Sequence, residues 1–226
     1  MSLILHLETA TRNCSVSLAE DGVLIGTAEW AGERYVHGER LHVFIKELVD
    51  AHGLALCDLS AVAVSKGPGS YTGLRIGVAA AKGLCYALDM PLIAIHTLTV
   101  LARAARDISD PRALIIPMLD ARRAEVYTRV YDLDFTARTE TKAVVLRPDS
   151  FSEFHQPLYF LGDGVAKASE VIQMPNARFL DIPYPSAKHM VALAYDEFVN
   201  ASFADLAYFE PYYLKDFIAI PPKCSV

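Results

Sequence analysis

The sequence has few of the features that mark secreted, membrane or metal-binding proteins. The chain of 226 residues contains four cysteines, at positions 14, 57, 85 and 224, and no CxxC pair. This pattern is typical of reduced thiols in a cytosolic protein rather than of a disulfide framework. Residues 1–10 carry no basic segment, and His6 and Glu8 interrupt their apolar run. We therefore expect no signal peptide, no membrane span and a cytoplasmic location.

Positive charge is also scarce. The chain has 21 Lys and Arg against 27 Asp and Glu, a net charge of −6, and no continuous basic run. Because nonspecific affinity for nucleic acid depends on Lys and Arg that neutralise phosphates, we expect the chain alone to bind RNA or DNA poorly. Apolar residues make up 53% of the sequence, above the usual level, which suggests a surface that a partner buries.

Residues 61–95 form the stretch around which we expect the rest of the chain to be organised. An apolar, β-prone run leads into a turn with two glycines and a proline, which can continue neither a strand nor a helix. The next segment lacks proline and is rich in alanine and leucine, so it predicts a helix that Ser70 or Thr72 can cap. Strand, crossover helix and strand indicate a parallel pair in an α/β sheet. The expected elements are a strand at 61–65, a turn at 66–69, a helix at 74–88 and a strand at 92–95.

The turn before this helix suggests an anion site but matches no known phosphate motif. Gly69 and Ser70 lie where free N–H groups at a helix N-terminus can hold a phosphate or carboxylate. A GxGxxG motif needs a glycine where Thr72 stands, and no Gly-Lys-Ser/Thr sequence forms a Walker A loop. A nucleophile elbow is excluded because Pro68 and Thr72 occupy its glycine positions. A turn without a ligand and a turn that contacts an anion both stay open.

Small residues recur along one face of the predicted helix, at Gly73, Gly77, Ala80 and Ala81. Such a face lets another backbone approach closely. The face either packs on the protein's own sheet or forms a tight contact with a partner helix. On the second interpretation, bulky residues at Gly77 or Ala80 block a heterodimer and leave the monomer folded.

A second amphipathic helix is predicted at 39–52, with its apolar residues at the spacing of one helical face. It packs on its own sheet or adds one edge to a docking surface. His37 and His42 are five residues apart, whereas zinc-binding helices place two histidines four apart, so we expect no metal site here. The apolar stripe of this helix consists of Leu41, Phe44, Ile45, Leu48 and Val49.

The pattern of elements runs twice along the chain, with a break at residues 109–111. Each half has three strands, a helical region, a strand, a glycine turn and a helix, and an acidic residue, Glu8 or Asp120, ends each first strand. This order predicts an internal duplication. The strands are expected at 3–7, 14–19 and 23–30, then at 113–119, 125–131, 143–146, 158–161 and 178–180, with helices at 97–106, 150–155, from 165 onward and at 188–200, the last capped by Ser186.

Five segments together resemble the TsaB (YeaZ) family, a relative of the TsaD family. This bacterial family supports threonylcarbamoylation of adenosine 37 in tRNAs that read ANN codons. The resemblance covers nearly the whole chain, and the segment around GPGSYTGLRIG is specific to TsaB and TsaD. The segments are LHLETAT, KGPGSYTGLRIGVAAAKGL, MLDARRAEVY, LGDGV and YPSAKHM.

The resemblance implies an α/β fold of the ASKHA type, shared with actin, Hsp70 and sugar kinases, with two duplicated lobes of mixed sheets flanked by helices. The N-terminal lobe then spans 1–108, joined by part of the C-terminal helix 187–201, and a smaller C-terminal lobe spans 109–226. The implied nucleotide cleft is vestigial, because Glu8 stands where kinases of this fold have an aspartate. Its residues would be Glu8, Thr9, Gly69, Ser70, Asp120, Gly162, Asp163 and Gly164.

The resemblance also implies partners and a non-catalytic role. TsaD holds a metal with an HxxxH pair and carries out the transfer, whereas the histidines here have the wrong spacing. The chain would pair with TsaD through its N-terminal helices, the pair would recruit TsaE, and TsaC would supply threonylcarbamoyl-AMP. No cofactor is required, any ATP or ADP would lie at the TsaD interface, tRNA would be contacted only within the complex, and the chain alone would form a homodimer. The implied interface comprises Arg40, Leu41, Phe44, Ile45, Leu48, Thr72, Gly73, Ile76, Gly77, Ala80 and Ala81.

Two other functions compete with this interpretation. An independent small-molecule kinase or ATPase of the same fold is disfavoured by Glu8 and by the imperfect phosphate turns. A peptidase is disfavoured more strongly, because no Ser/His/Asp or Cys/His arrangement is recognisable.

Overall fold

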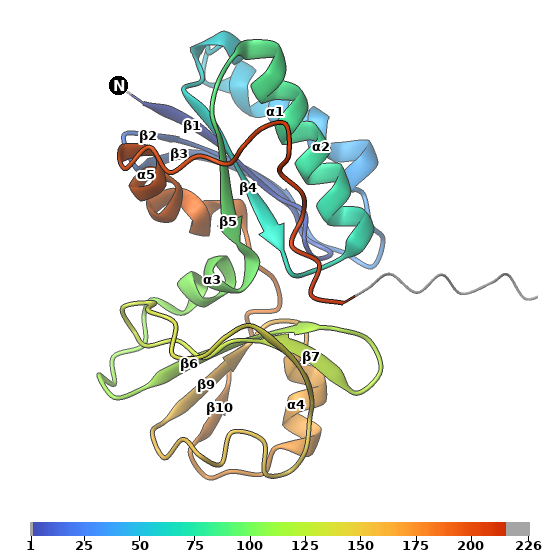
Figure 1. The fold of residues 1–226 in the computed structure, drawn as a ribbon, viewed down its shortest axis with the longest axis vertical. Helices are drawn as coiled ribbons and strands as arrows, with labels where there is room; N and C mark the ends of the chain where they lie inside the picture. The colour runs from blue at the N-terminus through green and yellow to red at the C-terminus, as the bar shows by residue number, and fades with distance from the viewer. Residues whose placement is uncertain (1, 216–226) are drawn as a thin grey trace, which may run out of the picture.

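The computed structural model describes residues 2–215, which fold into two lobes, each built on a five-stranded sheet (Figure 1). The N-terminal sheet has the order β3-β2-β1-β4-β5. Strand β1 pairs antiparallel with β2 and parallel with β4. The predicted strand–helix–strand unit is confirmed, because β4 and β5 are parallel neighbours. The strands are β1 Leu3–Glu8, β2 Cys14–Glu20, β3 Val23–Trp30, β4 Ala61–Gly67 and β5 Leu92–His96.

The C-terminal sheet repeats this topology. Its order is β10-β9-β6-β7-β8, so the first strand of the lobe is again central, with the second and third strands on one side and the fourth and fifth on the other. The directions match as well, since β6 pairs antiparallel with β7 and parallel with β9. The predicted internal duplication is thus confirmed. The strands are β6 Leu114–Asp120, β7 Glu125–Thr128, β8 Lys142–Val145, β9 Leu158–Leu161 and β10 Ala177–Phe179.

Helices cover both faces of the N-terminal sheet. Helices α1 (His37–Ala51) and α2 (Tyr71–Leu88) pack on one face, where alternate residues of β1 such as Leu5 and Leu7 meet them. The opposite face meets α5 (Val191–Val199), preceded by the 3-10 turn η3 (Ala187–Met190), through residues that include Ile4. Chain segments more than 180 residues apart therefore share one lobe.

The C-terminal lobe has less helix. Helix α4 (Val165–Val171) packs against one face of its sheet, and α3 (Thr97–Ala102), extended by the 3-10 turn η2 (Arg103–Ala105), packs against the other. Because α3 also contacts β4 and β5, it lies between the two sheets. Because helices cover both faces of this sheet, alternate residues of β6 are buried on opposite sides. Ile116 faces α4 and Ile115 faces α3.

Several boundaries differ from the sequence prediction. Helices α1 and α2 begin two and three residues earlier than predicted, and β7 ends at Thr128. Residues 150–155 form turns rather than a helix. Ser70 caps α2 by accepting a hydrogen bond from the Gly73 N–H, but Ser186 makes no cap, because its hydroxyl bonds Glu29 instead. The short η1 turn, Leu56–Asp58, was not predicted.

Within residues 2–215, no helix combines the length and apolarity that crossing a bilayer requires. Cys14, Cys57 and Cys85 are free thiols, and Cys224 lies outside the described residues.

Candidate functional site

Glu8, at the end of β1, is enclosed by the protein. Its side chain is 0% exposed, one oxygen accepts from the main-chain N–H of Ala10 at 2.8 Å, and the other is bonded to the hydroxyl of Ser65. Burial raises the pKa of Glu8 to about 7, against the lowering effect of these hydrogen bonds. The carboxyl group therefore has a structural role, because both of its oxygens are hydrogen-bonded within the chain.

The glycine turn after β4 folds back on the β1–β2 turn. The Ser70 N–H donates to the carbonyl oxygen of Ala10 at 2.7 Å, and a Cβ at Gly69 would meet that oxygen at 2.5 Å. One of the N–H groups predicted to be free is thus used inside the chain. The tail covers the other side of the turn, where the Tyr212 N–H donates to the Lys66 carbonyl at 2.6 Å.

The C-terminal half of the predicted cleft is built around two aspartates. The Asp120 N–H donates to Oδ1 of Asp163 at 2.8 Å, and Lys167 pairs with Asp120 at 2.6 Å. Burial, reinforced by the charge of Asp120, raises the pKa of Asp163 to about 6. Gly162 and Gly164 pack against Met118, where side chains would collide. The two carboxylates could bind a cation, but Lys167 already compensates the charge of Asp120.

Both halves of the predicted cleft lie at the carboxyl ends of parallel strands, β1 and β4 in one lobe and β6 and β9 in the other. Tyr184, on the segment that returns from the C-terminal lobe, interacts electrostatically with both Asp163 and Arg12. The tail also joins the halves, because Lys215 pairs with Glu125 and approaches the Ala121 carbonyl at 3.5 Å. The structure therefore brings the sequence-predicted residues to one region.

The predicted docking residues mostly lie inside the lobe, and this part of the prediction is corrected. Thr9 Oγ1 donates to the Gly73 carbonyl at 2.8 Å, and side chains at Gly73 or Gly77 would collide with Thr9. The small face of α2 thus closes on the β1–β2 turn of the same chain, and a bulky residue at Gly77 would disrupt the fold rather than block an outer surface. The core also takes up Leu41, Phe44, Ile45, Leu48 and Ala81, each less than 9% exposed.

A groove does run along the outer side of α1 and α2, but other residues form it. Its volume is about 440 Å³. Of the predicted interface, only Ile76 and Ala80 line it, and Thr72 is exposed on the same helix. A second run of small residues four positions apart, Ala79 and Gly83, is the signal in the sequence that could have found it. The full lining is His42, Ile76, Ala79, Ala80, Gly83 and Leu84.

Arg40 does not line this groove. Its guanidinium lies 4.7 Å from the Phe44 ring and lines a separate hollow of about 410 Å³ with Trp30 and Arg34. Arg40 thus belongs to the end of the lobe where β3 leads into α1.

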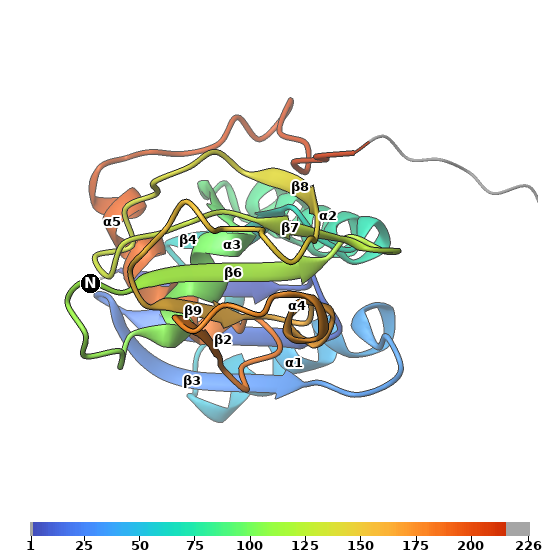
Figure 2. The same cartoon turned by 90° about the horizontal axis from the view of Figure 1, so that it is seen from below.

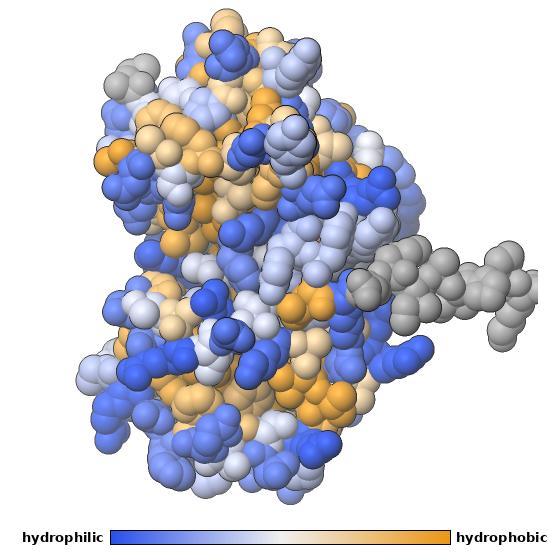
Figure 3. Space-filling model, viewed as in Figure 1, coloured by the Kyte–Doolittle hydropathy of each residue, from blue (hydrophilic) through white to orange (hydrophobic). Residues whose placement is uncertain are grey.

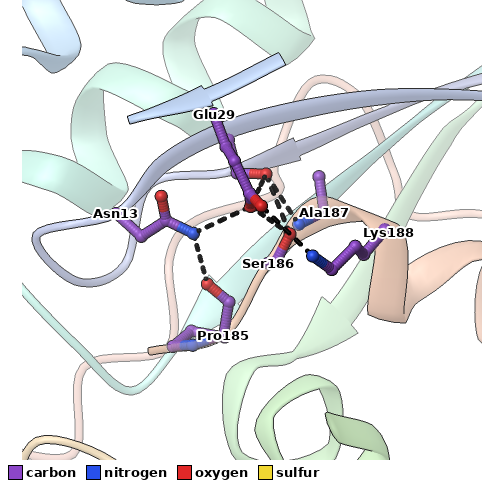
Figure 4. A network of polar contacts seen from close by, with 7 residues as sticks. Asn13, Glu29, Pro185, Ser186, Ala187 and Lys188 are labelled. Atoms are coloured by element: carbon purple, nitrogen blue, oxygen red, sulfur yellow. Dashed lines mark hydrogen bonds and ion pairs between the residues drawn. The ribbon is translucent and has the colours of Figure 1, made fainter. Parts of the chain in front are cut away.

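A polar network missed by the sequence reasoning ties the two ends of the chain together (Figure 4). Glu29, on β3, accepts hydrogen bonds from Ser186 at 2.6 Å and Lys188 at 3.1 Å. Asn13 bridges Glu29 and the Pro185 carbonyl, and the Ala187 N–H donates to Ser15 at 3.0 Å. Partial burial alone would raise the pKa of Glu29, but the bonds from Ser186, Lys188 and Asn13 outweigh it and lower that pKa. The network fixes the segment that re-enters the N-terminal lobe.

Comparison with known proteins identifies the family of this chain. The family model of TsaD, described as tRNA N6-adenosine threonylcarbamoyltransferase, matches residues 34–220. The tRNA threonylcarbamoyladenosine biosynthesis protein TsaB of Haemophilus influenzae is 30% identical over 94% of this chain and 93% of its own length. The chain belongs to the TsaB family.

Further relatives agree with this family. TsaB of Escherichia coli is 29% identical over 96% of both chains. YeaZ from Pseudomonas aeruginosa superposes with a TM-score of 0.82 at 26% identity and covers 95% of this chain and 100% of its own. The expected fold of two duplicated lobes with mixed sheets flanked by helices is thus shown, and the family places the protein in threonylcarbamoyladenosine biosynthesis.

His37 and His42, the two histidines compared above with a zinc-binding pair, have different surroundings in the structure. His37 is buried at the start of α1, and its Nε2 lies 2.7 Å from the Thr11 carbonyl oxygen. Burial lowers the pKa of His37, so the ring is neutral near pH 7. His42 lines the groove instead. Among residues 2–215, no three His, Cys, Asp or Glu side chains gather as a metal site.

Proposed function

We propose that the protein is a non-catalytic subunit of the cytoplasmic threonylcarbamoyladenosine system. It acts by pairing with the TsaD of the same organism through the groove between α1 and α2. The pair then recruits TsaE, and TsaC supplies threonylcarbamoyl-AMP. The observation that carries this proposal is the groove itself, an apolar hollow on the outside of a lobe whose core is otherwise closed.

The chemistry of the groove suits a helical partner. Five of its six lining residues are apolar or glycine. A Cβ atom added at Gly83 would have no neighbouring atom within 4 Å, so this position opens onto free space. Val43 and Tyr86, on the same two helices, are 39% and 84% exposed. Exposed apolar hollows of this kind mark protein interfaces. A TsaD partner is supported because the chain itself matches the TsaD family model, and related folds can pair through equivalent faces.

The non-catalytic role is supported by the engagement of the acidic residues. Both Glu8 oxygens are hydrogen-bonded within the chain, and Lys167 compensates Asp120. The alternative, an independent small-molecule kinase or ATPase, requires one of these carboxylates to act on a ligand. Purified protein that hydrolysed ATP or phosphorylated a small substrate, with the activity lost in Glu8→Ala or Asp120→Ala, would establish that alternative.

Substitutions at Gly83 test the groove. Gly83→Arg fills the hollow without touching the core, so we expect co-purification with TsaD to be lost while the far-UV circular dichroism spectrum is unchanged. Gly83→Ala keeps the surface small and should pair normally. Glu47→Arg, at an exposed position of α1 outside the groove lining, controls for an added arginine. Retained pairing in Gly83→Arg would refute this docking surface.

Reconstitution tests the role itself. TsaD, TsaE, TsaC and unmodified tRNA should form threonylcarbamoyladenosine with the wild-type protein and not without it, and Gly83→Arg should behave as the omission does. In the absence of TsaD we expect a homodimer through the same groove, which the same substitution should convert to a monomer in gel filtration. Full modification without this protein would contradict the proposal.

A further inference from the structure

Two consecutive arginines occupy a strained turn between β6 and β7. Arg122 and Arg123 have φ angles of 68° and 52°, a region that favours glycine and asparagine over residues with a larger side chain. The turn is held by its main chain, because the Arg122 N–H donates to Asp120 Oδ1 at 2.6 Å and the Glu125 N–H to the Arg122 carbonyl at 3.2 Å. Both side chains are exposed. The fold therefore gives no reason for arginine at either position, and strain of this kind gathers at functional sites.

Other arginines lie at the same edge of the molecule. Seen from below, β3 and β6 point to the same side, so the turns that follow them lie at the same side of the molecule (Figure 2). The parallel pairing of β1 with β4 and of β6 with β9 puts the carboxyl ends of all four strands at this side. We call this surface the basic edge. It consists of Arg12 after β1, Arg40 and Arg75 in the first turns of α1 and α2, Arg122 and Arg123 after β6, and Arg147 after β8.

The two lobes contribute to one continuous surface. Tyr212 and Lys215 are three residues apart, and they bind Lys66 at the end of β4 and Ala121 at the end of β6, respectively. This short segment of the tail therefore contacts the turns of both lobes. On the face seen in Figure 3, hydrophilic side chains follow the boundary between the lobes, beside the described end of the tail.

The six arginines of the basic edge differ from the arginines of the opposite edge in their ion pairing, although other cations at this edge do pair, as Arg34 with Glu39 and Lys167 with Asp120. None of the six forms an ion pair with any residue in the described range 2–215. At the opposite edge Arg106, Arg112 and Arg138 each pair with an aspartate. That edge also holds several acidic turns. Its acids include Glu20, Asp21, Asp50, Asp89, Asp110, Asp132 and Asp134.

Aromatic side chains accompany the arginines. Tyr35 is 56% exposed with Arg12 at 6.0 Å from its ring, and Arg75 lies 5.4 Å from the ring of Tyr71. Tyr213 packs on Tyr71 and is 41% exposed. Guanidinium groups without an ion pair, near the exposed rings of Tyr35 and Tyr213, suit RNA, because the cations contact phosphates and the rings stack on unpaired bases.

We propose that the basic edge, with Arg122 and Arg123 at its centre, holds the phosphate backbone of the substrate tRNA when the protein is paired with TsaD. This proposal rests on the proposed function. A guanidinium fork binds phosphate oxygens in a bidentate manner, which fixes the RNA without reading its sequence. The net charge of −6, with Glu33 and Glu39 at this same edge, keeps the isolated chain a poor RNA binder, so the contact is effective only when a partner adds further cations.

The test measures tRNA binding by the assembled complex. Arg122→Gln/Arg123→Gln should weaken the binding of an unmodified tRNA transcript about tenfold near 0.1 M salt, and should reduce the slope of log K against log salt by about 1 to 2. The matched control, Arg106→Gln/Arg112→Gln, removes the same charge from the opposite edge and should stay within about twofold of wild type on both measures.

Co-purification with TsaD separates this proposal from the proposed function. If the wild-type chain does not pair with TsaD, the proposed function fails. If the Arg122/Arg123 variant pairs normally and binds tRNA with the wild-type affinity and salt slope, the inference is overturned. It is also overturned if the variant keeps its RNA affinity and loses a protein partner, since the edge then docks an acidic protein surface.

Discussion

The hydroxyl of Thr9 donates a hydrogen bond to the main-chain carbonyl of Gly73, 2.8 Å away and 64 residues later in the chain. The contact holds the start of α2 against the turn that follows β1. It needs glycine, because a Cβ at residue 73 would overlap the Thr9 carbonyl oxygen. The small residues of α2 thus permit a close approach within the lobe.

Alanine at two glycines of the same helix should have opposite effects on stability. Gly73→Ala forces the Thr9 backbone to move, so we expect the free energy of unfolding to fall by about 2 to 3 kcal/mol. Gly83→Ala meets open space and improves helix propensity, so it should raise that free energy by about 1 kcal/mol. Urea unfolding at equilibrium measures both, and equal shifts in the midpoint would show that α2 does not pack as described.

The small-residue stripe shows what the sequence could and could not predict. Its spacing correctly indicated a close backbone approach, but spacing alone cannot say which backbone approaches. The choice depends on Thr9, which is remote in sequence. Leu41 and Phe44 pose the same problem, since an amphipathic stripe looks alike whether it packs on its own sheet or on a partner. The strands and their duplication were predictable because alternation and turn residues act locally.

Glu8→Gln should remove a pH-dependent loss of stability. Burial raises the pKa of Glu8 to about 7, from 4.5 in the unfolded chain. The folded protein therefore binds more protons between these values, so the Glu8 contribution to stability falls as pH rises from about 4.5 to 7 and is constant above. By this shift the loss is about 3 kcal/mol. Glutamine can still accept from Ala10 and donate to Ser65, so the variant should be the more stable at pH 8.

The difference between variant and wild type isolates Glu8. Burial lowers the pKa of His6, His96 and His189 to about 4 each, so these groups make stability rise with pH from about 4 to 6.5 and oppose Glu8. Both proteins contain these histidines, so their contribution cancels when the free energies of unfolding, measured by chemical denaturation from pH 5 to 8, are subtracted. A constant difference over that range would mean that Glu8 is ionised in the fold at pH 5.

Ser186→Ala should loosen the segment that returns to the N-terminal lobe. The substitution removes the 2.6 Å hydrogen bond to Glu29 and leaves a half-buried carboxylate with fewer donors, so we expect a loss of about 1 to 2 kcal/mol. Amide hydrogen exchange should quicken in residues 185–190 and stay unchanged in α2. Ser169→Ala, whose hydroxyl bonds only a carbonyl of its own helix, is the control and should alter neither measure.

No local pattern reveals this network, because Ser186 and Glu29 are 157 residues apart. A serine before a helical segment is read from sequence as a cap. The competing carboxylate becomes visible only when β3 and η3 are placed together. Residues of this kind depend on tertiary structure, and sequence reasoning assigned Ser186 the wrong role for that reason.

Glycine at Arg122 should be tolerated by the fold despite the loss of a side chain. Its φ of 68° is strained for arginine, so Arg122→Gly relieves strain while it adds freedom to the unfolded chain. We expect the free energy of unfolding to be unchanged or to rise by up to about 1 kcal/mol. Arg147→Gly, at an exposed position of the same edge without a positive φ, gains no such relief and should lose about 0.5 to 1 kcal/mol. Thermal unfolding of the two variants side by side checks the difference. If Arg122→Gly is destabilised as much as Arg147→Gly, the turn is not strained and arginine there needs no functional explanation. If Arg122→Gly is more stable than the wild type, the native arginine is kept at the expense of stability, as expected for a residue that binds a ligand.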